Sequence, residues 1–123
     1  MKPGEGGLAR VIAATGHSFK GLKACWDHEA AFRQNATLAV FLFGLSFFVA
    51  NGPEQWLLLN FPGMLLLIVE LLNSAIENTV DRIGLEPNPL SGRAKDMASA
   101  AVFLCLCLIG LCWSVVTWNN FFR

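Results

Sequence analysis

Residues 55–82 read QWLLLNFPGMLLLIVELLNSAIENTVDR, and this stretch decides the fold because it is apolar over most of its length. A transmembrane helix needs about 20 mostly apolar residues. Residues 35–53 and 97–122 contain no charged residue at all. The sequence therefore predicts three transmembrane helices, at about residues 35–52, 55–80 and 96–120, with Asn51, Gly52 and Pro53 forming the turn between the first two.

The composition agrees with a protein whose solvent is the bilayer. The chain has 123 residues, of which 54% are hydrophobic and only 15% are charged, against roughly 25% charged in a typical globular domain. The mean hydropathy is +0.51. Nine basic and nine acidic residues cancel, which excludes a basic surface for nucleic acid and an acidic disordered tail. We therefore expect a single all-α membrane domain covering residues 1–123.

Polar residues form one narrow stripe on the second predicted span. At about 100° per residue, Glu77 lies about 20° to one side of Glu70, and Asp81 lies about 20° to the other. Asn73 and Ser74 flank the same line. Glu70 lies about 16 Å along the helix axis from Asp81, so it reaches into the membrane if Asp81 marks the interface.

An ionisable side chain at that depth needs a physical reason. It costs about 2.5–3.5 kcal/mol even on the lenient insertion scale, so the stripe must face a polar cavity, another subunit or a bound cation. A hydrogen-bonded seam between helices is the structural alternative, because polar residues hold helices together in membranes. Three aligned acids repel one another unless they are protonated or neutralised, and this favours a functional site over a seam.

Basic residues predict the orientation, because cytoplasmic loops are enriched in Lys and Arg. Eight of the nine basic residues fall on one side of the three spans: Lys2, Arg10, Lys20, Lys23, Arg33, Arg82, Arg93 and Lys95. Only Arg123 lies on the other. We expect the amino terminus and the 82–95 loop to be cytoplasmic, and Trp56, Trp113 and Trp118 to lie near the outer interface.

The segment before the first span has a different pattern. Apolar or neutral residues recur at alternating steps of four and three: Leu8, Ile12, Thr15, Phe19, Leu22 and Trp26. That spacing is typical of one face of a helix. Because transmembrane spans follow directly, we expect residues 8–33 to form an amphipathic helix lying in the membrane interface.

The cytoplasmic boundary also offers groups that suit a phosphate ligand. Ser91 is the expected N-cap of the third span, and a helix N-terminus attracts anions. Arg93, Lys95 and Asp96 follow within the first turn. Mg²⁺ commonly takes one or two carboxylates together with phosphate oxygens. The residues alone thus permit a metal–nucleotide site with Glu70 beside a lipid hydroxyl, and they equally permit proton or ion transport.

Three segments of the chain resemble the bacterial integral-membrane diacylglycerol kinases: KGLKACWDHEAAFRQ, IVELLNSAIENTVDRIG and LSGRAKDMASAAV. The resemblance implies a homotrimer in the inner membrane, with active sites shared between subunits. It implies transfer of the γ-phosphoryl group of ATP to the hydroxyl of diacylglycerol, giving phosphatidic acid. An undecaprenol kinase of a related branch is the nearest alternative, since both share the E-x-x-N-x-A-I-E core; the EAAFRQ segment favours diacylglycerol.

The resemblance also implies a role for each matching residue. Glu70 is the general base and Asn73 helps to align the site, while Glu29 and Glu77 hold Mg²⁺ with the nucleotide phosphates. The remaining implied nucleotide contacts are Arg10, His17, Asp81, Glu86, Asn88, Lys95 and Asp96. The implied lipid contacts, besides Arg10 and Glu70, are Ala14, Ser18, Phe19, Lys23, Trp26, Ala31, Gln34, Ser99, Trp113 and Trp118.

Three residues depart from the pattern of that family. His17 stands where a tyrosine is common, Asn88 where a histidine is common, and Asn35 where an acid is common.

Overall fold

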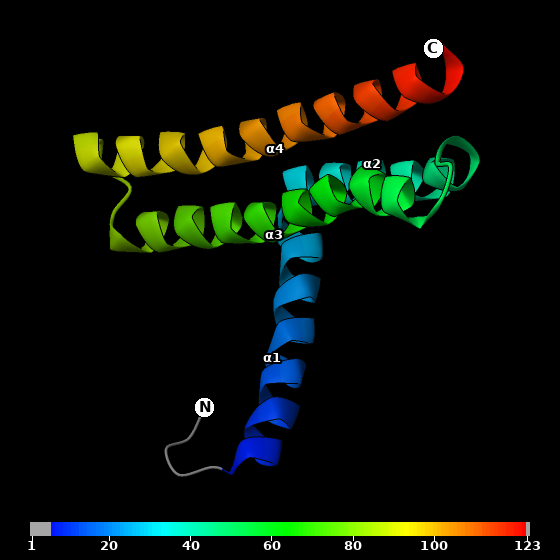
Figure 1. The fold of residues 1–123 in the computed structure, drawn as a ribbon. Coiled ribbons are helices and arrows are strands. Elements are labelled where there is room, and N and C mark those ends of the chain that lie inside the picture. Colours follow the sequence, from blue (N-terminus) through cyan, green and yellow to red (C-terminus); the bar gives the residue numbers. More distant parts are fainter. Residues whose placement is uncertain (1–5, 123) are drawn as a thin grey trace.

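The computed structural model describes residues 6–122, and all its regular elements there are helices (Figure 1). They are α1 (Gly7–His28), α2 (Ala30–Val49), α3 (Pro53–Ile83) and α4 (Pro89–Phe121). The last three are long and apolar enough to cross a membrane. This confirms an all-helical chain with three candidate spans. Lys2 and Arg123, which enter the charge count, lie outside the described residues.

The helices extend beyond the spans expected from hydropathy. At 1.5 Å per residue, the 31 residues of α3 measure about 46 Å, which exceeds the roughly 30 Å of a bilayer hydrocarbon core. The 33-residue α4 is longer still and begins at Pro89 rather than near residue 96. The charged ends of both helices therefore project past the apolar layer while remaining helical.

A break at Glu29 separates α1 from α2. Glu29 has φ −120° and ψ 106°, an extended conformation between two helices. The helix expected over residues 8–33 thus ends at His28, and residues 30–33 belong to α2. Beyond this break, α1 points away from the other three helices (Figure 1).

The α2–α3 connection is the tight turn that the sequence predicts. Gly52 has φ 98°, the one φ between +20° and +160° among residues 6–122, and Pro53 starts α3. The backbone N–H of Asn51 donates to Gln55 Oε1 at 2.8 Å. Gln55 in turn exchanges hydrogen bonds with Asn120, which also donates to the Val49 carbonyl at 2.7 Å. These hydrogen bonds connect α2, α3 and α4 at this end of the bundle.

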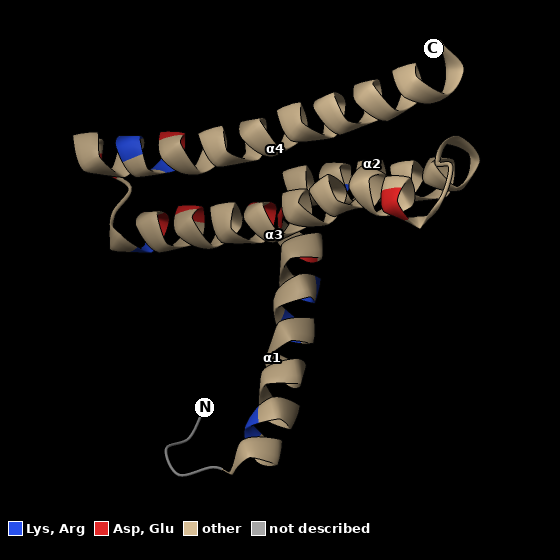
Figure 2. Ribbon diagram, in the orientation of Figure 1, with Lys and Arg blue, Asp and Glu red and all other residues tan. Residues whose placement is uncertain are grey.

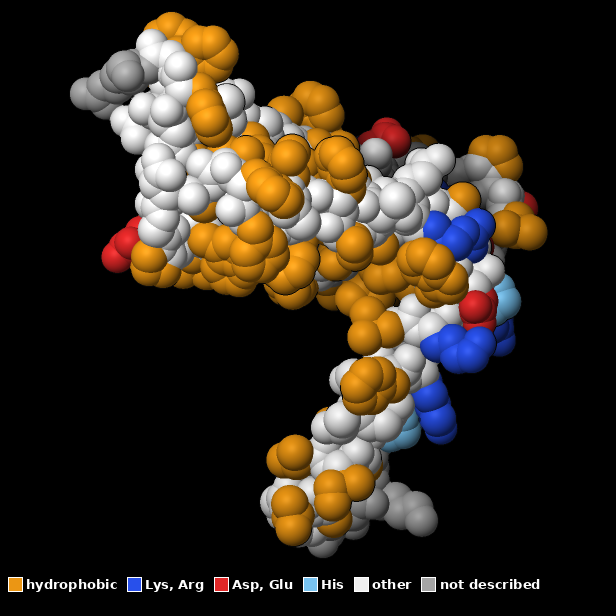
Figure 3. Space-filling view, turned by 90° about the vertical axis from the view of Figure 1, so that its right-hand side faces the viewer, with side chains coloured by type: hydrophobic (Ala, Val, Ile, Leu, Met, Phe, Trp, Pro, Cys, Tyr) orange, Lys and Arg blue, Asp and Glu red, His pale blue; other side chains and the backbone are white. Residues whose placement is uncertain are grey.

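The core of a single chain is small and lies between α3 and α4. Leu66, Cys105 and Ile109 are buried against each other, and Trp113 packs on their edge. Most large apolar side chains are exposed, and Figure 3 shows them covering the outside of the bundle. A surface of this kind is stable against lipid tails or other apolar helices rather than against water.

The N-cap of α4 differs from the expectation. Asn88, not Ser91, caps the helix: its Oδ1 accepts from the N–H groups of Leu90 at 2.8 Å and Ser91 at 3.2 Å. Pro89 occupies the first helical position, which needs no donor. Ser91 matches the cap composition, but it already lies inside the first turn.

We expect Asn88→Ala to lower the free energy of unfolding by about 1 kcal/mol, the usual cost of losing an N-cap. Asn88→Asp keeps an acceptor at the same distance and serves as the matched control. Denaturation by SDS in mixed micelles, followed by circular dichroism, measures both. Equal stability of Asn88→Ala and the unsubstituted protein would show that the cap contributes nothing.

Candidate active site

The site is built around a carboxylate buried in the middle of α3. Glu70 is only 2% exposed. Its Oε2 accepts from Asn35 Nδ2 at 2.6 Å, and its Oε1 accepts from Asn73 Nδ2 at 3.0 Å. A buried carboxylate is costly unless it is hydrogen-bonded, and here the donors are neutral amides from two helices.

Asn73 connects Glu70 to the next acid of the stripe. Its Nδ2 also donates to Glu77 Oε1 at 3.3 Å. Because both neighbours are carboxylates, the amide nitrogen must face them, and Oδ1 points elsewhere. That oxygen is buried and has no hydrogen-bond partner among the described residues. An unpaired buried acceptor of this kind is suited to a ligand that donates a hydrogen or carries a positive charge.

Exposure increases along the stripe, as the helical spacing predicts. Glu70 is buried, Glu77 is half-buried and Asp81 is exposed. Lys95, near the start of α4, pairs with Asp81 at 2.6 Å, and both side chains are about half exposed. Figure 2 shows that the charged residues of α3 and α4 gather mainly toward the α3–α4 loop. The stripe therefore leads from a charged rim to a buried carboxylate.

The C-terminal end of α1 closes one side of the stripe. Cys25 is buried, and its Sγ donates to Ser74 Oγ at 3.5 Å. Burial raises the pKa of the Cys25 thiol and outweighs the lowering effect of the hydrogen bond with Ser74, while the carboxylates of Glu29 and Glu70 add smaller raising effects. The thiol therefore stays protonated at neutral pH and remains a donor to Ser74.

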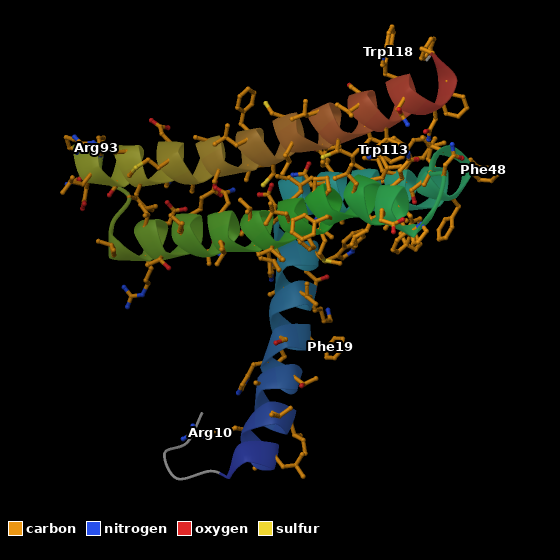
Figure 4. All side chains as sticks on the ribbon, viewed as in Figure 1. Arg10, Phe19, Phe48, Arg93, Trp113 and Trp118 are labelled. Atoms are coloured by element: carbon orange, nitrogen blue, oxygen red, sulfur yellow. The ribbon has the colours of Figure 1, made fainter. Side chains whose placement is uncertain are left out.

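The rest of α1 lies away from the stripe. Figure 4 labels Arg10 near the far end of this helix and Phe19 part-way along it, both pointing outward. Ser18 donates to the Ala14 carbonyl of its own helix, and Lys23 pairs with Asp27 at 2.6 Å. His17 and Trp26 belong to the same helix and are exposed. One chain does not bring these predicted site residues to Glu70.

The remaining predicted residues lie at three other places. Glu29, Ala31 and Gln34 lie at or just after the α1–α2 break. Glu86 and Asn88 lie in the α3–α4 connection, and Asp96 and Ser99 are exposed on the first turns of α4. Trp113 and Trp118 lie toward the other end of α4 (Figure 4), where Trp118 stacks on Phe122 with ring centroids 5.6 Å apart.

No group of three or more His, Cys, Asp or Glu side chains within residues 6–122 could hold a metal ion. A magnesium–nucleotide site does not require such a group, because the ion takes one or two carboxylates and fills its other positions with phosphate oxygens and water. The half-buried Glu77 carboxylate supplies oxygen ligands of that kind, while Asn73 Oδ1 points away from it.

Sequence reasoning missed Asn35 as a partner of Glu70. Its signals are a polar amide at the start of an uncharged span and the departure from a commonly acidic position. Neither signal reveals which residue of another helix the amide meets.

Comparison with known proteins places these features in one family. The model of the prokaryotic diacylglycerol kinases matches residues 16–117, which include the whole stripe and the start of α4. The chain is 44% identical over 115 residues to a diacylglycerol kinase of Escherichia coli strain K12, covering 94% of each chain. It is 47% identical over 113 residues to one of Pseudomonas aeruginosa, covering 92% of each.

A diacylglycerol kinase of Haemophilus influenzae is 45% identical over 107 residues, which is 87% of this chain and 91% of that protein. Arg10, Ala14 and Trp118 lie outside the residues that the family model matches. The chain belongs to the prokaryotic diacylglycerol kinase family.

Proposed function

We propose that this protein transfers the γ-phosphoryl group of ATP to the free hydroxyl of diacylglycerol, forming phosphatidic acid and ADP. The family membership supports this activity. The observation that carries it is the Glu70 carboxylate, which is 2% exposed within a helix long enough to cross a membrane. A base at that depth is placed for an alcohol that resides in the bilayer.

Glu70 acts as the general base. The hydrogen bonds from the two Asn amides leave lone pairs of the carboxylate free, because its two oxygens accept about four hydrogen bonds in all. The lipid hydroxyl donates its proton to Glu70 while its oxygen bonds to the γ-phosphorus, and the bond from that phosphorus to the ADP oxygen breaks. The absence of a cation on Glu70 within residues 6–122 suits this role, since a salt bridge would stabilise the anion and weaken it as a base.

Glu29 and Glu77 are the proposed holders of Mg²⁺, and the Asn73 amide nitrogen donates to Glu77 Oε1 at 3.3 Å. The bound ion would offset the charge that develops on the transferred phosphate. Glu77 lies about 10 Å along the helix axis from Glu70. The metal-holding and proton-accepting carboxylates are thus separated along the stripe, and Asn73 joins them.

The nucleotide contacts proposed at the charged rim are Asp81, Glu86, Asn88, Lys95 and Asp96. Arg10 and His17 complete them from α1. Because α1 of one chain points away from its own stripe, we propose a homotrimer in which neighbouring subunits complete each site. The exposed apolar surface of the bundle (Figure 3) supports such an assembly.

The orientation belongs to the same proposal. We place the protein in the bacterial inner membrane, with the amino terminus and the charged rim in the cytoplasm, where ATP is available. We place α1 in the interface. Figure 3 supports this placement, since hydrophobic side chains lie along one side of α1 and basic ones along the other. The apolar lipid contacts of this helix, Phe19 and Trp26, then face the layer that holds the substrate.

Paired assays in detergent micelles test the reaction and its acceptor. Purified protein receives ATP with diacylglycerol in one series and with undecaprenol in the other, each with and without Mg²⁺. We expect phosphatidic acid as the main product, and no product after the divalent ion is removed. A preference for undecaprenol would overturn the substrate assignment, and activity without divalent ions would overturn the metal assignment.

A further inference from the structure

A short hydrogen bond joins α2 to the buried carboxylate of α3. Asn35 Nδ2 lies 2.6 Å from Glu70 Oε2, 35 residues apart in the chain. Asn35 is half-buried on the second turn of α2, just after the break at Glu29. No other described hydrogen bond connects α2 to Glu70.

The chemistry of the pair determines which end of the amide faces the carboxylate. An ionised carboxylate only accepts hydrogen bonds, so Asn35 must present its NH₂ group to Glu70. A bond from a donor to an ionised acceptor is roughly twice as strong as one between neutral groups. Asn35 therefore favours one orientation of the Glu70 carboxylate.

Asn35 and Asn73 hold the carboxylate from two directions. Asn73 reaches Oε1 from the next turn of α3, while Asn35 reaches Oε2 from α2. The hydrogen bond from Asn73 alone would fix the carboxylate only relative to α3, because both residues belong to that helix. The α2 contact fixes the second oxygen and couples the orientation of Glu70 to the packing of α2 on α3.

The other charged or titratable groups around Glu70 do not replace that contact. Glu77, on the same helix, meets Asn73 rather than Glu70. Cys25 on α1 donates to Ser74, and Glu29 lies at the α1–α2 break. On α4, Lys95 is engaged with Asp81 at the rim. Within residues 6–122, the side-chain hydrogen bonds to Glu70 thus come from two neutral amides.

We infer that Asn35 is a positioning residue for the phosphoryl-transfer reaction, which orients the Glu70 carboxylate and keeps it ready to accept the proton of the lipid hydroxyl. This inference rests on the proposed function for its kinetic consequence, while the underlying contact does not depend on activity.

The kinetic test compares the pH dependence of kcat for Asn35→Asp and Asn35→Leu with that of the unsubstituted protein. Asn35→Asp has the same shape but brings a second carboxylate to Glu70, and like charges disfavour ionisation. Asn35→Leu removes the donor. In both variants we expect the acid limb of the kcat profile to move to higher pH, by about one unit or more in Asn35→Asp. At pH values above the shifted limb, kcat should partly recover.

Thr37→Val is the matched control. Thr37 is exposed two residues further along α2, and its hydroxyl donates to the Arg33 carbonyl of its own helix at 2.7 Å. This variant removes a side-chain hydrogen bond from the same helix without touching Glu70, so we expect its profile to superimpose on the unsubstituted one. A purely structural role for Asn35 predicts a uniform fall in kcat with an unmoved acid limb, and that result overturns the inference.

Infrared titration separates this inference from the proposed activity. The carboxyl stretch that disappears in Glu70→Gln reports protonation of Glu70, and its midpoint requires no substrate. We expect the midpoint of this titration to rise in both Asn35 variants. For Asn35→Asp, the spectrum of the Asn35→Asp, Glu70→Gln double variant is subtracted to remove the band of the new acid. A raised midpoint in a protein that phosphorylates no lipid rejects the function alone. Normal kinase activity with an unmoved midpoint rejects the role of Asn35.

Discussion

Glu70→Gln is expected to reduce kcat by about 10²–10⁴-fold, the range that a positioned general base contributes. Gln keeps the size of the side chain and one carbonyl acceptor, but it has no charge and cannot take the proton of the lipid hydroxyl. One Asn amide can still donate to that carbonyl, and the other can rotate to accept from the new NH₂ group. We therefore expect the variant to fold and assemble normally, as gel filtration in detergent measures.

Glu54→Gln is the control for this experiment. Glu54 is an exposed acid in the first turn of the same helix, at the end opposite the charged rim. It should retain full activity. Near-normal kcat in Glu70→Gln would show that Glu70 is not the base. Loss of assembly without a separate catalytic effect would instead support the hydrogen-bonded seam.

Lys95→Met is expected to lower kcat/KM for ATP by about 10²–10³-fold, as the loss of one preorganised charge contact on a transferring group does. In the structure Lys95 contacts Asp81 at 2.6 Å, and both side chains are about half exposed. An exposed ion pair contributes only about 0–1 kcal/mol to stability. If the pair were purely structural, breaking it from either side would have the same small effect.

Asp81→Asn and Arg82→Met make the Lys95 comparison decisive. Asp81→Asn breaks the same pair and leaves Lys95 free for phosphate, so its effect should be at least tenfold smaller. Arg82→Met removes an exposed cation from the last turn of α3 and should leave kcat/KM close to the unsubstituted value. Initial rates at varied ATP concentration measure all three. Equal losses from Lys95→Met and Asp81→Asn would contradict a direct role for Lys95 on the nucleotide.

The helices and the stripe follow from short-range rules that a sequence displays directly. Bilayer thickness sets the length of an apolar span, and the 3.6-residue period aligns Glu70, Asn73 and Glu77 on one face. The observed contacts of Asn73 with both glutamates confirm that alignment. The turn at Gly52 was equally predictable, because its residues suit a turn whatever surrounds them.

The contacts between helices were not predictable in this way. Whether Asn35 meets Glu70 depends on how far α2 is rotated and shifted against α3, and hydropathy does not encode that register. The N-cap of α4 was predicted at the wrong residue for a related reason. Ser91 and Asn88 both have suitable side chains, and only the backbone conformation shows that Pro89 already starts the helix.

The break at Glu29 is a third such feature. Residues 26–33 contain no Gly or Pro, so the sequence gives no signal that ends the first helix before residue 33. The change of direction there leaves α1 outside the bundle, which determines that Arg10 and His17 cannot serve the stripe of their own chain. Their role therefore depends on the proposed assembly.

The central claim is that a buried carboxylate in a membrane helix directs phosphate onto a membrane alcohol. Its most direct test supplies purified protein with Mg²⁺, diacylglycerol and ATP labelled on the γ-phosphorus, and measures the label in the extracted lipid. We predict labelled phosphatidic acid from the unsubstituted protein and background label from Glu70→Gln. Unlabelled lipid from the unsubstituted protein, or equal labelling by both proteins, would contradict the account.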